Sequence, residues 1–405
     1  MFAAHPIRLG VVGTGFIARG LVALCSARAD WRVTGMLTRR PVSQVRCPRP
    51  ELVTRSLDQL IEGCDVVVEC SGTVRHAAEA VRAAHAAGKP VVTMNSEFHA
   101  TVGSHFVGSG MLTEAEGDQS GSLAALEEEV REMGFEPKIF GNTKGFLNLH
   151  PTAEEMGYWA ERQGIRVEQV TAFTDGTKVQ IEQALVANGL GGTIVQPGLL
   201  GPRVETVAEG VERLWEKVES LDRPCADYVV TSQWPGSIFI SATHSAADPA
   251  ALRYFKMGPG PLHTMVRPYH LCFLEIGKTL TRLRQGRGPL LNNSERPRVS
   301  VAAIAKCDIP RGTRLERGIG SFQVRGESVL LGDDPEHVPI GLLEDARITT
   351  RLEAGQPVRR GDVELPDSLA LEAWRAIQAR AVDWDREDSG MRTSERELAG
   401  TPGAV

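Results

Sequence analysis

The chain has 405 residues, which is too many for one compact core and predicts two or three domains. Its hydrophobic content of 42% and charged content of 24% are ordinary for a globular protein in water. The net charge of −6 argues against a general affinity for nucleic acid or anionic membranes, and an aromatic content of 5% offers no stacking surface for bases. Neither nucleic acid nor a membrane is therefore expected as a partner.

The seven cysteines are scattered and none forms a CxxC pair, which predicts neither a zinc site nor a disulfide framework. The first residues, MFAAHPIRLGVVG, lead almost directly into a strand. They show no signal-peptide pattern, and no apolar run is long enough to span a bilayer. A cytoplasmic protein is therefore expected.

A strand, a glycine turn and a helix follow one another in IRLGVVGTGFIARGLVALCSA. In the turn, the first glycine permits a tight bend, the second lets the backbone approach a pyrophosphate, and Ala18 lets helix and strand pack closely. A glycine turn without a ligand is the alternative, but the strand before it and the helix after it are the context of a dinucleotide site. The predicted cofactor-binding residues of this turn are Gly13, Thr14, Gly15, Phe16 and Ile17.

The second predicted strand, WRVTGML, ends in Thr38, Arg39 and Arg40. An acidic residue at this position would hold the ribose hydroxyls of NAD. Guanidinium groups suit a 2′-phosphate instead, so NADP(H) is favoured over NAD(H). The alternative, that Arg39 and Arg40 are merely solvated, has nearly equal weight.

Two further apolar runs, CDVVVECSG and KPVVTMNSE, are typical of parallel strands buried on both faces. With the first two strands and the helices between them, they predict a doubly wound parallel sheet. The carboxyl ends of strands line the cofactor crevice of such a sheet. We therefore expect Ser71, Gly72 and Asn95 near the nicotinamide, with Glu97 beside them.

The segment FTDGTKVQIEQALVANGLG carries the catalytic candidates Asp175, Lys178 and Glu182. Asp175 follows a strand-like VTAFT and is predicted to cap a helix that runs to about Asn188, a candidate substrate ligand. The alternative is a surface ion pair at i,i+4 worth ~0.3–0.5 kcal/mol. We prefer a cleft, because the charges lie at the capped end of an apolar helix. A lysine with tuned pKa can donate a proton or act as an electrophile, and carboxylates can orient it or hold a metal.

A second group of polar residues follows in LRYFKMGPGPLHTMVRPYHLCFLE. A hairpin is expected to bring Lys256, Arg267 and His270 together as a pocket for a phosphate or carboxylate. The equally weighted alternative is an interior histidine and a surface arginine. Earlier in the chain, Asp118 and Lys144 are further candidates for substrate binding.

These motifs make the chain resemble the homoserine-dehydrogenase-like NAD(P)-dependent oxidoreductases that carry a C-terminal SAF domain. Among them it is most similar to the 1-deoxy-D-xylulose 5-phosphate reductoisomerase-like enzymes. The resemblance extends from Gly10 to Leu315 and is carried by GVVGTGFIARG, VVTMNSEFHATVG, AEGDQSGSL, GNTKGFLN, FTDGTKVQIEQALVANGLG, RPYHLCFLE and VAAIAKCDIPRGTRL.

The resemblance implies an α/β fold with a Rossmann doubly wound parallel sheet, a second α/β substrate and dimerisation domain, and a small β-rich SAF domain. It also implies a homo-oligomer that rearranges and reduces a ketose phosphate with NADPH and a divalent metal, Mn or Mg. Lys178 then becomes the acid/base or electrophile. Asp175, Glu182 and Glu97 become candidate substrate or metal contacts, without a firm set of metal ligands.

The chain departs from the family pattern at three positions. His99 stands where relatives often carry aspartate, and Ser120 where they commonly carry proline. Ser96 stands where homoserine dehydrogenases carry lysine, which argues against homoserine as substrate. Two alternative functions therefore stay open. One is a metal-independent alcohol or sugar dehydrogenase, and the other is an NAD(P)-binding sensor or scaffold that would tolerate Lys178→Ala.

Composition shifts divide the chain into four expected parts. A linker, QGRGPLLNNSERPR, precedes a β-rich segment in which strands and Pro/Gly turns recur. The helical pattern DSLALEAWRAIQARAVD is expected to dock on another domain, and the polar tail after it is expected to be disordered. The predicted ranges are 1–140 for the Rossmann domain, 141–298 for the substrate domain, 299–366 for the SAF-like domain, and 367–405 for the helix and tail.

Overall fold

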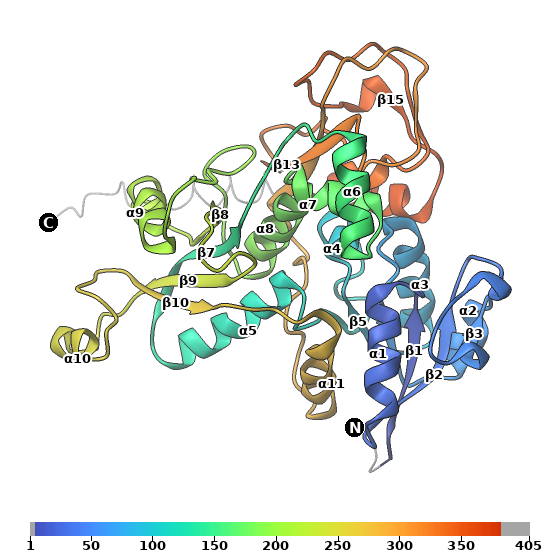
Figure 1. Ribbon diagram of the computed structural model, residues 1–405, viewed down its shortest axis with the longest axis horizontal. Coiled ribbons are helices and arrows are strands. Elements are labelled where there is room, and N and C mark those ends of the chain that lie inside the picture. The colour runs from blue at the N-terminus through green and yellow to red at the C-terminus, as the bar shows by residue number, and fades with distance from the viewer. Residues whose placement is uncertain (1–4, 382–405) are drawn as a thin grey trace, which may run out of the picture.

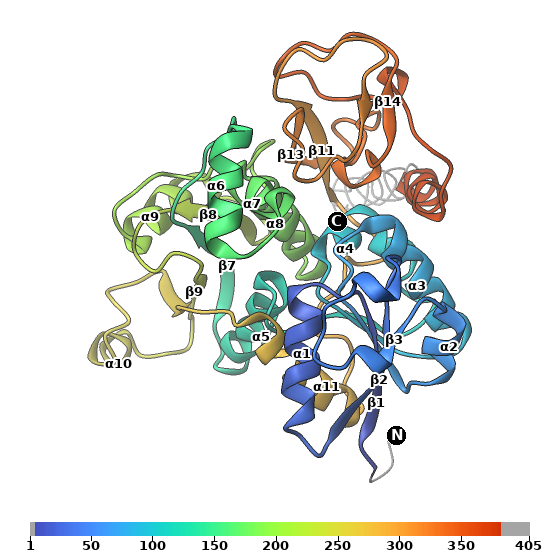
Figure 2. The same ribbon diagram turned by 45° about the vertical axis from the view of Figure 1, so that its right-hand side comes forward.

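The computed structural model describes residues 5–381, and Figure 1 shows its three parts. A blue parallel sheet with its helices forms the first part, and a green and yellow mixed sheet forms the second. An orange β-rich part lies above both, and Figure 2 shows the same separation from another side. The polar tail for which we expect disorder, residues 382–405, lies outside the described residues.

The first sheet has six parallel strands in the order β3-β2-β1-β4-β5-β6. The strand order reverses between β1 and β4, so the ligand crevice of this fold lies beyond the carboxyl ends of these two strands. This arrangement confirms the doubly wound sheet. The strands are β1 (Ile7–Val12), β2 (Trp31–Leu37), β3 (Val53–Thr54), β4 (Val66–Glu69), β5 (Val91–Thr93) and β6 (Leu112–Glu114).

Helices cover both faces of this sheet, which explains why its central strands are apolar throughout. One face packs against α2 (Leu57–Glu62) and α3 (Val74–Ala86), and the other against α1 (Phe16–Ser26). The second face also receives α11 (Ile276–Arg284), although the sequence predicts that these residues belong with the second domain. Gly277 permits the close approach, because a Cβ there would lie 1.9 Å from the Trp31 ring.

The second sheet has four strands in the order β10-β9-β7-β8, with β7 and β8 parallel and the other pairs antiparallel. One face packs against α9 (Val207–Val218), and the other against α5 (Gln119–Glu132) and α8 (Thr177–Gly189). This mixed sheet with helices confirms the second α/β unit. Its strands are β7 (Glu136–Lys144), β8 (Cys225–Val230), β9 (Ile238–Thr243) and β10 (His263–Arg267), and α10 (Pro249–Tyr254) lies between β9 and β10.

Helix α8 is the central element of the molecule. Its residues from Thr177 to Asn188 are all buried. It contacts α5 and β8 of the second sheet, α4 (Ser96–Val102) of the first part, and both β11 (Val299–Ala305) and β13 (Val324–Leu330) of the third. A helix that is packed on every side needs no amphipathic pattern. The alternative interpretation of its charges as a solvated surface face is therefore wrong.

The segment before α8 differs from the prediction. VTAFT is not a strand but the end of α7 (Val167–Thr174), which follows α6 (Ala153–Gln163). The N-cap of α8 is Gly176, whose φ of 82° is readily adopted only by glycine. This residue lets the chain turn sharply from α7 into α8. Packing against neighbouring elements has overridden the β preference of the valine, threonine and phenylalanine side chains.

The third part is β-rich, and a helix docks on it. β11 pairs with β13, and a second small sheet joins β12 (Arg314–Leu315), β14 (Ala346–Ile348) and β15 (Val363–Glu364). The helical periodicity predicts an apolar face of Leu369, Ala370, Trp374 and Ile377. In the helix at 369–381, Ala370, Trp374 and Ile377 are buried and Leu369 is half-buried. Within residues 5–381, the helices are all too short or too polar to cross a membrane.

Candidate functional site

The glycine turn between β1 and α1 has the geometry of an anion-binding cradle. Gly13 has a φ of 111°, and a Cβ on it would lie 2.8 Å from the carbonyl oxygen of Cys70. A Cβ on Gly15 would meet no atom within 4 Å, so it would project into open space beside the helix N-terminus. No side chain caps the first N–H groups of α1. These exposed donors and the open space in front of them fit a pyrophosphate.

The end of β2 brings arginine side chains to this cradle. The Arg40 Nη2 donates to Thr14 Oγ1 at 2.8 Å, and its backbone N donates to Thr38 Oγ1 at 3.2 Å. Arg39 faces α3, where burial and the charge of Arg39 lower the pKa of His76. Both arginines are exposed, so their guanidinium groups are accessible to a phosphate and to solvent alike.

Polar residues at the ends of β4 and β5 form the next part of the crevice. Glu69 is fully buried and accepts hydrogen bonds from Ser71 N at 2.7 Å and Thr93 Oγ1 at 3.1 Å. It thereby fixes the loop that carries Ser71 and the exposed Gly72. Asn95 is also fully buried, and its side chain caps α4 through Phe98 N at 3.0 Å. Asn95 therefore holds the start of α4 in place.

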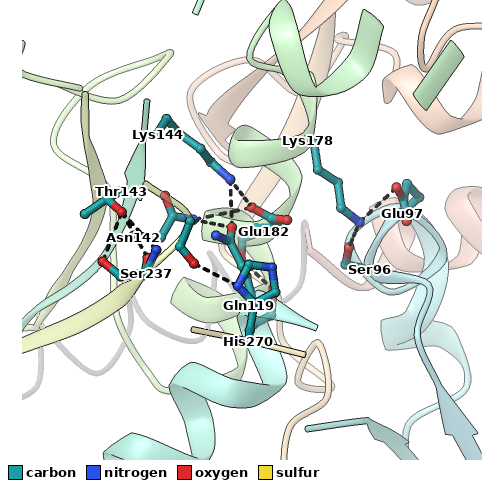
Figure 3. A network of polar contacts seen from close by, with 12 residues as sticks. Ser96, Glu97, Gln119, Asn142, Thr143, Lys144, Lys178, Glu182, Ser237 and His270 are labelled. Atoms are coloured by element: carbon teal, nitrogen blue, oxygen red, sulfur yellow. Dashed lines mark hydrogen bonds and ion pairs between the residues drawn. The ribbon is translucent and has the colours of Figure 1, made fainter. Parts of the chain in front are cut away.

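Lys178 reaches from α8 to the start of α4, as Figure 3 shows. Its Nζ donates to Ser96 Oγ at 2.6 Å and to Glu97 Oε1 at 2.9 Å. Lys178 is 82 positions from Ser96 and 81 positions from Glu97 in the sequence, and the three residues meet at the carboxyl edge of the first sheet. The sequence predicts each of Lys178 and Glu97 as a site residue, and the structure joins them directly.

The charge of Lys178 is set by its surroundings. Burial lowers the pKa of this lysine, but the carboxylates of Glu97, Asp118 and Glu182 raise it, and the net result lies above its ordinary value. The ammonium form therefore predominates at neutral pH. Lys178 can donate a hydrogen bond or a proton to an oxygen that becomes strongly basic.

A second lysine lies on the side of the second sheet (Figure 3). Lys144, at the end of β7, donates to Gln119 Oε1 at 2.7 Å and to Glu182 Oε2 at 2.9 Å. Asn142 Nδ2 donates to the same two oxygens, at 3.0 and 3.3 Å. Lys178 and Glu182 are therefore not paired with each other, because each has a partner on a different domain. The sequence does not predict Gln119 or Asn142 as site residues, because an amide side chain carries no pattern of its own.

A pair of titratable side chains is buried near Lys178. His99 on α4 and Glu114 at the end of β6 are both fully buried, and His99 Nε2 lies 3.6 Å from Glu114 Oε2. Burial lowers the pKa of His99 to about 3. Burial and the nearby Asp118 raise the pKa of Glu114 well above its ordinary value. Burial therefore favours the uncharged form of both side chains.

Asp118 belongs to the same region. One of its carboxylate oxygens, Oδ2, is buried without a hydrogen-bond partner among the described residues. Its charge raises the pKa of both Lys178 and Glu114, which places it near both. The sequence predicts Asp118 as a substrate contact, and this role stays a prediction.

Two predicted residues, Asp175 just before α8 and Asn188 near its end, have other partners. Asp175 is fully buried, and its Oδ2 lies 2.5 Å from Lys306 Nζ at the end of β11. Asn188 donates to Asn293 Oδ1 and to the carbonyl oxygen of Val299, and accepts from the backbone N of Arg298 and of Val299. Every hydrogen-bonding position of this amide is filled. The structure brings neither side chain to Lys178.

The hairpin residues do not form the expected pocket. Lys256 is exposed and follows α10, which lies far from α8 in Figures 1 and 2. Arg267 is engaged by Glu116 and Glu129, each at 3.0 Å. His270 Nδ1 lies 2.8 Å from the carbonyl oxygen of Gly236, whose backbone N donates to the carbonyl oxygen of Thr143.

Two family models match the chain. One, described as oxidoreductase DRL, catalytic domain, matches residues 117–276, and one described as homoserine dehydrogenase, NAD binding domain, matches residues 13–105. The first span contains Lys144, Lys178 and Glu182, and the second contains the glycine turn and Glu97. No curated protein matches the sequence significantly.

Solved structures with a similar arrangement include three bacterial proteins. UDP-N-acetylglucosamine 3-dehydrogenase GnnA from Acidithiobacillus ferrooxidans is 13% identical, with a TM-score of 0.40 over 71% of this chain and 92% of that one. A probable dehydrogenase from Thermotoga maritima is 15% identical, with a TM-score of 0.42 over 71% and 91%. An NAD-binding protein from Listeria innocua is 15% identical, with a TM-score of 0.37 over 72% and 93%. Likeness at this level carries no information about substrate.

Proposed function

We propose that this chain, an NAD(P)-dependent oxidoreductase with a nicotinamide-binding domain, interconverts a hydroxyl and a carbonyl group on a small polyhydroxylated substrate, with Lys178 as its proton donor and acceptor. The position of the Lys178 ammonium between Ser96 and Glu97 carries this proposal. It lies at the carboxyl edge of the Rossmann sheet, where a dinucleotide ends in this fold.

The chemistry of the step follows from the surroundings of Lys178. A bound nicotinamide would supply the hydride for the new C–H bond, and the carbonyl oxygen would gain a negative charge as its π bond breaks. Ser96 and Glu97 take two of the three N–H groups of Lys178 among the described contacts, which leaves one for that oxygen. Lys178 then transfers its proton to the oxygen, and in the reverse direction it receives the proton back.

The Lys144 group favours a substrate with several hydroxyl groups. At the carboxyl end of β7, the side chains of Lys144, Gln119, Asn142 and Glu182 place donors and acceptors side by side. Glu182 already neutralises the Lys144 ammonium, so a substrate phosphate would have to compete with this carboxylate. Hydroxyl groups can use the same oxygens and nitrogens without such competition. We therefore place an uncharged polyol or sugar-like substrate ahead of a phosphorylated one.

The reductoisomerase is the more specific candidate function, and it requires a divalent metal. Residues 5–381 contain no cluster of three or more His, Cys, Asp or Glu side chains arranged to hold a metal ion. Glu97 and Glu182 each have a lysine ammonium where a cation would lie. The donors present therefore do not fit a metal, and we derive no step through one. A metal-independent dehydrogenase is the function that this donor set supports better.

Three finer expectations remain part of the proposal. Arg39 and Arg40 beside the glycine turn support a preference for NADP(H). The β-rich sequence pattern and the small sheets β11-β13 and β12-β14-β15 support a SAF-like third domain. A homo-oligomer in the cytoplasm rests on the resemblance alone, and size-exclusion chromatography with light scattering would test the oligomer.

The experiment is a screen that follows NADPH absorbance at 340 nm with purified protein. Ketoses and aldoses are supplied with NADPH, and the matching polyols with NADP⁺. One arm contains 1-deoxy-D-xylulose 5-phosphate with manganese and is repeated with a chelator. With the best substrate, Lys178→Met is expected to lower kcat about 10²- to 10⁴-fold, because general acid–base catalysis contributes about this much.

The matched control is Lys217→Met, which removes an exposed lysine on α9 and should leave kcat unchanged. A Lys178→Met protein that binds NADPH and keeps the wild-type rate would disprove the role of Lys178. Turnover of 1-deoxy-D-xylulose 5-phosphate that the chelator abolishes would place the reductoisomerase first. If every substrate fails while NADPH binds, the sensor or scaffold becomes the leading hypothesis.

A further inference from the structure

The residues next to Lys178 on α8 are held by the C-terminal β-rich part of the chain. Asp175 Oδ1 accepts from the backbone N of Thr177 at 2.9 Å, and so fixes the first turn of the helix. Its other oxygen lies 2.5 Å from Lys306 Nζ. Lys306 also donates to the carbonyl oxygen of Ser321 at 2.5 Å, which ties the lysine to its own domain. The helix start is therefore attached to β11 through one carboxylate.

Two further contacts fix the same turn. Gly326 N on β13 donates to Thr177 Oγ1 at 2.9 Å. Ser328 N donates to Gln180 Oε1, and Ser328 Oγ donates to the carbonyl oxygen of Gln180, both at 2.8 Å. Thr177 and Gln180 lie on either side of Lys178 in the sequence. Hydrogen bonds from the third part thus hold this turn along most of its length, while the Lys178 side chain extends away to α4.

The Asp175–Lys306 pair is buried from solvent, with side-chain exposures of 0% and 3%. A buried ion pair contributes little net stability compared with apolar side chains of the same size, because both charges lose their hydration. Such a pair does impose a fixed geometry, since each charge must stay beside the other. Its presence at the start of α8 is therefore better explained by orientation than by stability.

We infer that Asp175 and Lys306 are positioning residues, and that the C-terminal β-rich part is a structural component of the active site that holds Lys178 against Glu97. This inference rests on the role proposed for Lys178 above. It assigns Asp175 an indirect role in place of the direct catalytic role expected from the sequence. It also gives the third part of the chain a role in catalysis, although its strands form sheets separate from those of the other two parts.

The test compares Lys306→Met with Arg351→Met in the full chain. The second variant breaks the Arg351–Asp308 pair of the same domain, whose side chains are 68% and 56% exposed. With the best substrate of the screen, at a temperature where every variant is folded, Lys306→Met should lower kcat about 10- to 100-fold, because misplacing a reacting group by ~1 Å costs this much. KM and the NADPH dissociation constant should stay within about twofold of wild type. Arg351→Met should match wild type in all three.

A second substitution keeps the test decisive if Lys306→Met fails to fold. Thr177→Val replaces the hydroxyl that accepts from Gly326 N with a methyl group, and it should also lower kcat. Thr177→Ser keeps a hydroxyl at this position and should have the wild-type kcat. Hydrogen exchange of peptides that cover residues 172–183 needs no substrate, and it should be faster in Lys306→Met and Thr177→Val only.

The two hypotheses fail separately. If Lys178→Met keeps its activity, the proposed function is wrong. If Lys178→Met is inactive but folded Lys306→Met and Thr177→Val keep the wild-type kcat, only the positioning role is wrong. Unchanged hydrogen exchange of residues 172–183 in both variants would overturn the inference without any assay of activity.

Discussion

His99 and Glu114 show how burial favours the uncharged form of titratable side chains next to a charged site. They lie within 3.6 Å of each other, both fully buried, and neither has a hydrogen-bond partner among the described residues. The pKa of His99 is lowered to about 3 by burial, so folding opposes protonation of this imidazole. The unfolded chain has no such restriction, and its histidines take up a proton near pH 6.5.

The free energy of unfolding should therefore depend on His99 in acid. Neutral His99 makes its full contribution to the free energy of unfolding above pH ~6.5. As the pH falls from there toward 3, the free energy of unfolding decreases by up to about 1.4 kcal/mol per pH unit. His99→Gln should remove this part of the dependence between pH 7.5 and 5.5. Urea unfolding at both values measures it, with His150→Gln, a change at an exposed histidine, as the control. Equal pH dependence in wild type and His99→Gln would contradict the buried neutral state.

At the scale of elements, the sequence predicts what depends on local pattern. The glycine turn, the apolar parallel strands and α3 are found where they are expected, because each has a continuous signal. The end of α7 is missed, since VTAFT has strand-like residues that become helical only through packing. The contact between Lys178 and Glu97 is not predictable either. It depends on how α8 crosses α4, which no spacing in the sequence encodes.

Asn188 illustrates the difference between a site residue and a residue that joins elements. It lies at the end of α8 opposite Lys178 and fills all four hydrogen-bonding positions of its amide, so it fastens the segment that leads into β11. Asn188→Ala should lower the free energy of unfolding by about 3 kcal/mol, because it leaves two backbone N–H groups without acceptors. The NADPH dissociation constant should not change.

Asn292→Ala is the matched control for this change. The Asn292 side chain accepts one hydrogen bond, from Ser294 N at 3.0 Å, so its loss should cost about 1 kcal/mol or less. Denaturant unfolding measures the free energy of unfolding of each variant, and NADPH fluorescence measures its NADPH dissociation constant. If Asn188→Ala weakened cofactor or substrate binding while leaving stability intact, the binding role expected from the sequence would be restored.

At the scale of the whole molecule, α8 lies where all three parts meet. Lys178 reaches the first part, Glu182 pairs with Lys144 of the second, and Asp175 pairs with Lys306 of the third. Three charges that the sequence places on one short segment therefore serve three different contacts. This explains why the segment is both charged and buried.

The most direct test of this account is a crystal structure of the complex with NADP⁺. The nicotinamide C4 should lie within about 6 Å of Lys178 Nζ, because hydride transfer needs a separation of ~3.5 Å from the substrate carbon and the lysine a hydrogen bond of ~3 Å to its oxygen. The pyrophosphate should rest on the turn at Gly13 and Gly15, with the 2′-phosphate beside Arg39 and Arg40. A nicotinamide ring directed away from Lys178, or a dinucleotide bound elsewhere, would contradict the assignment of the active site.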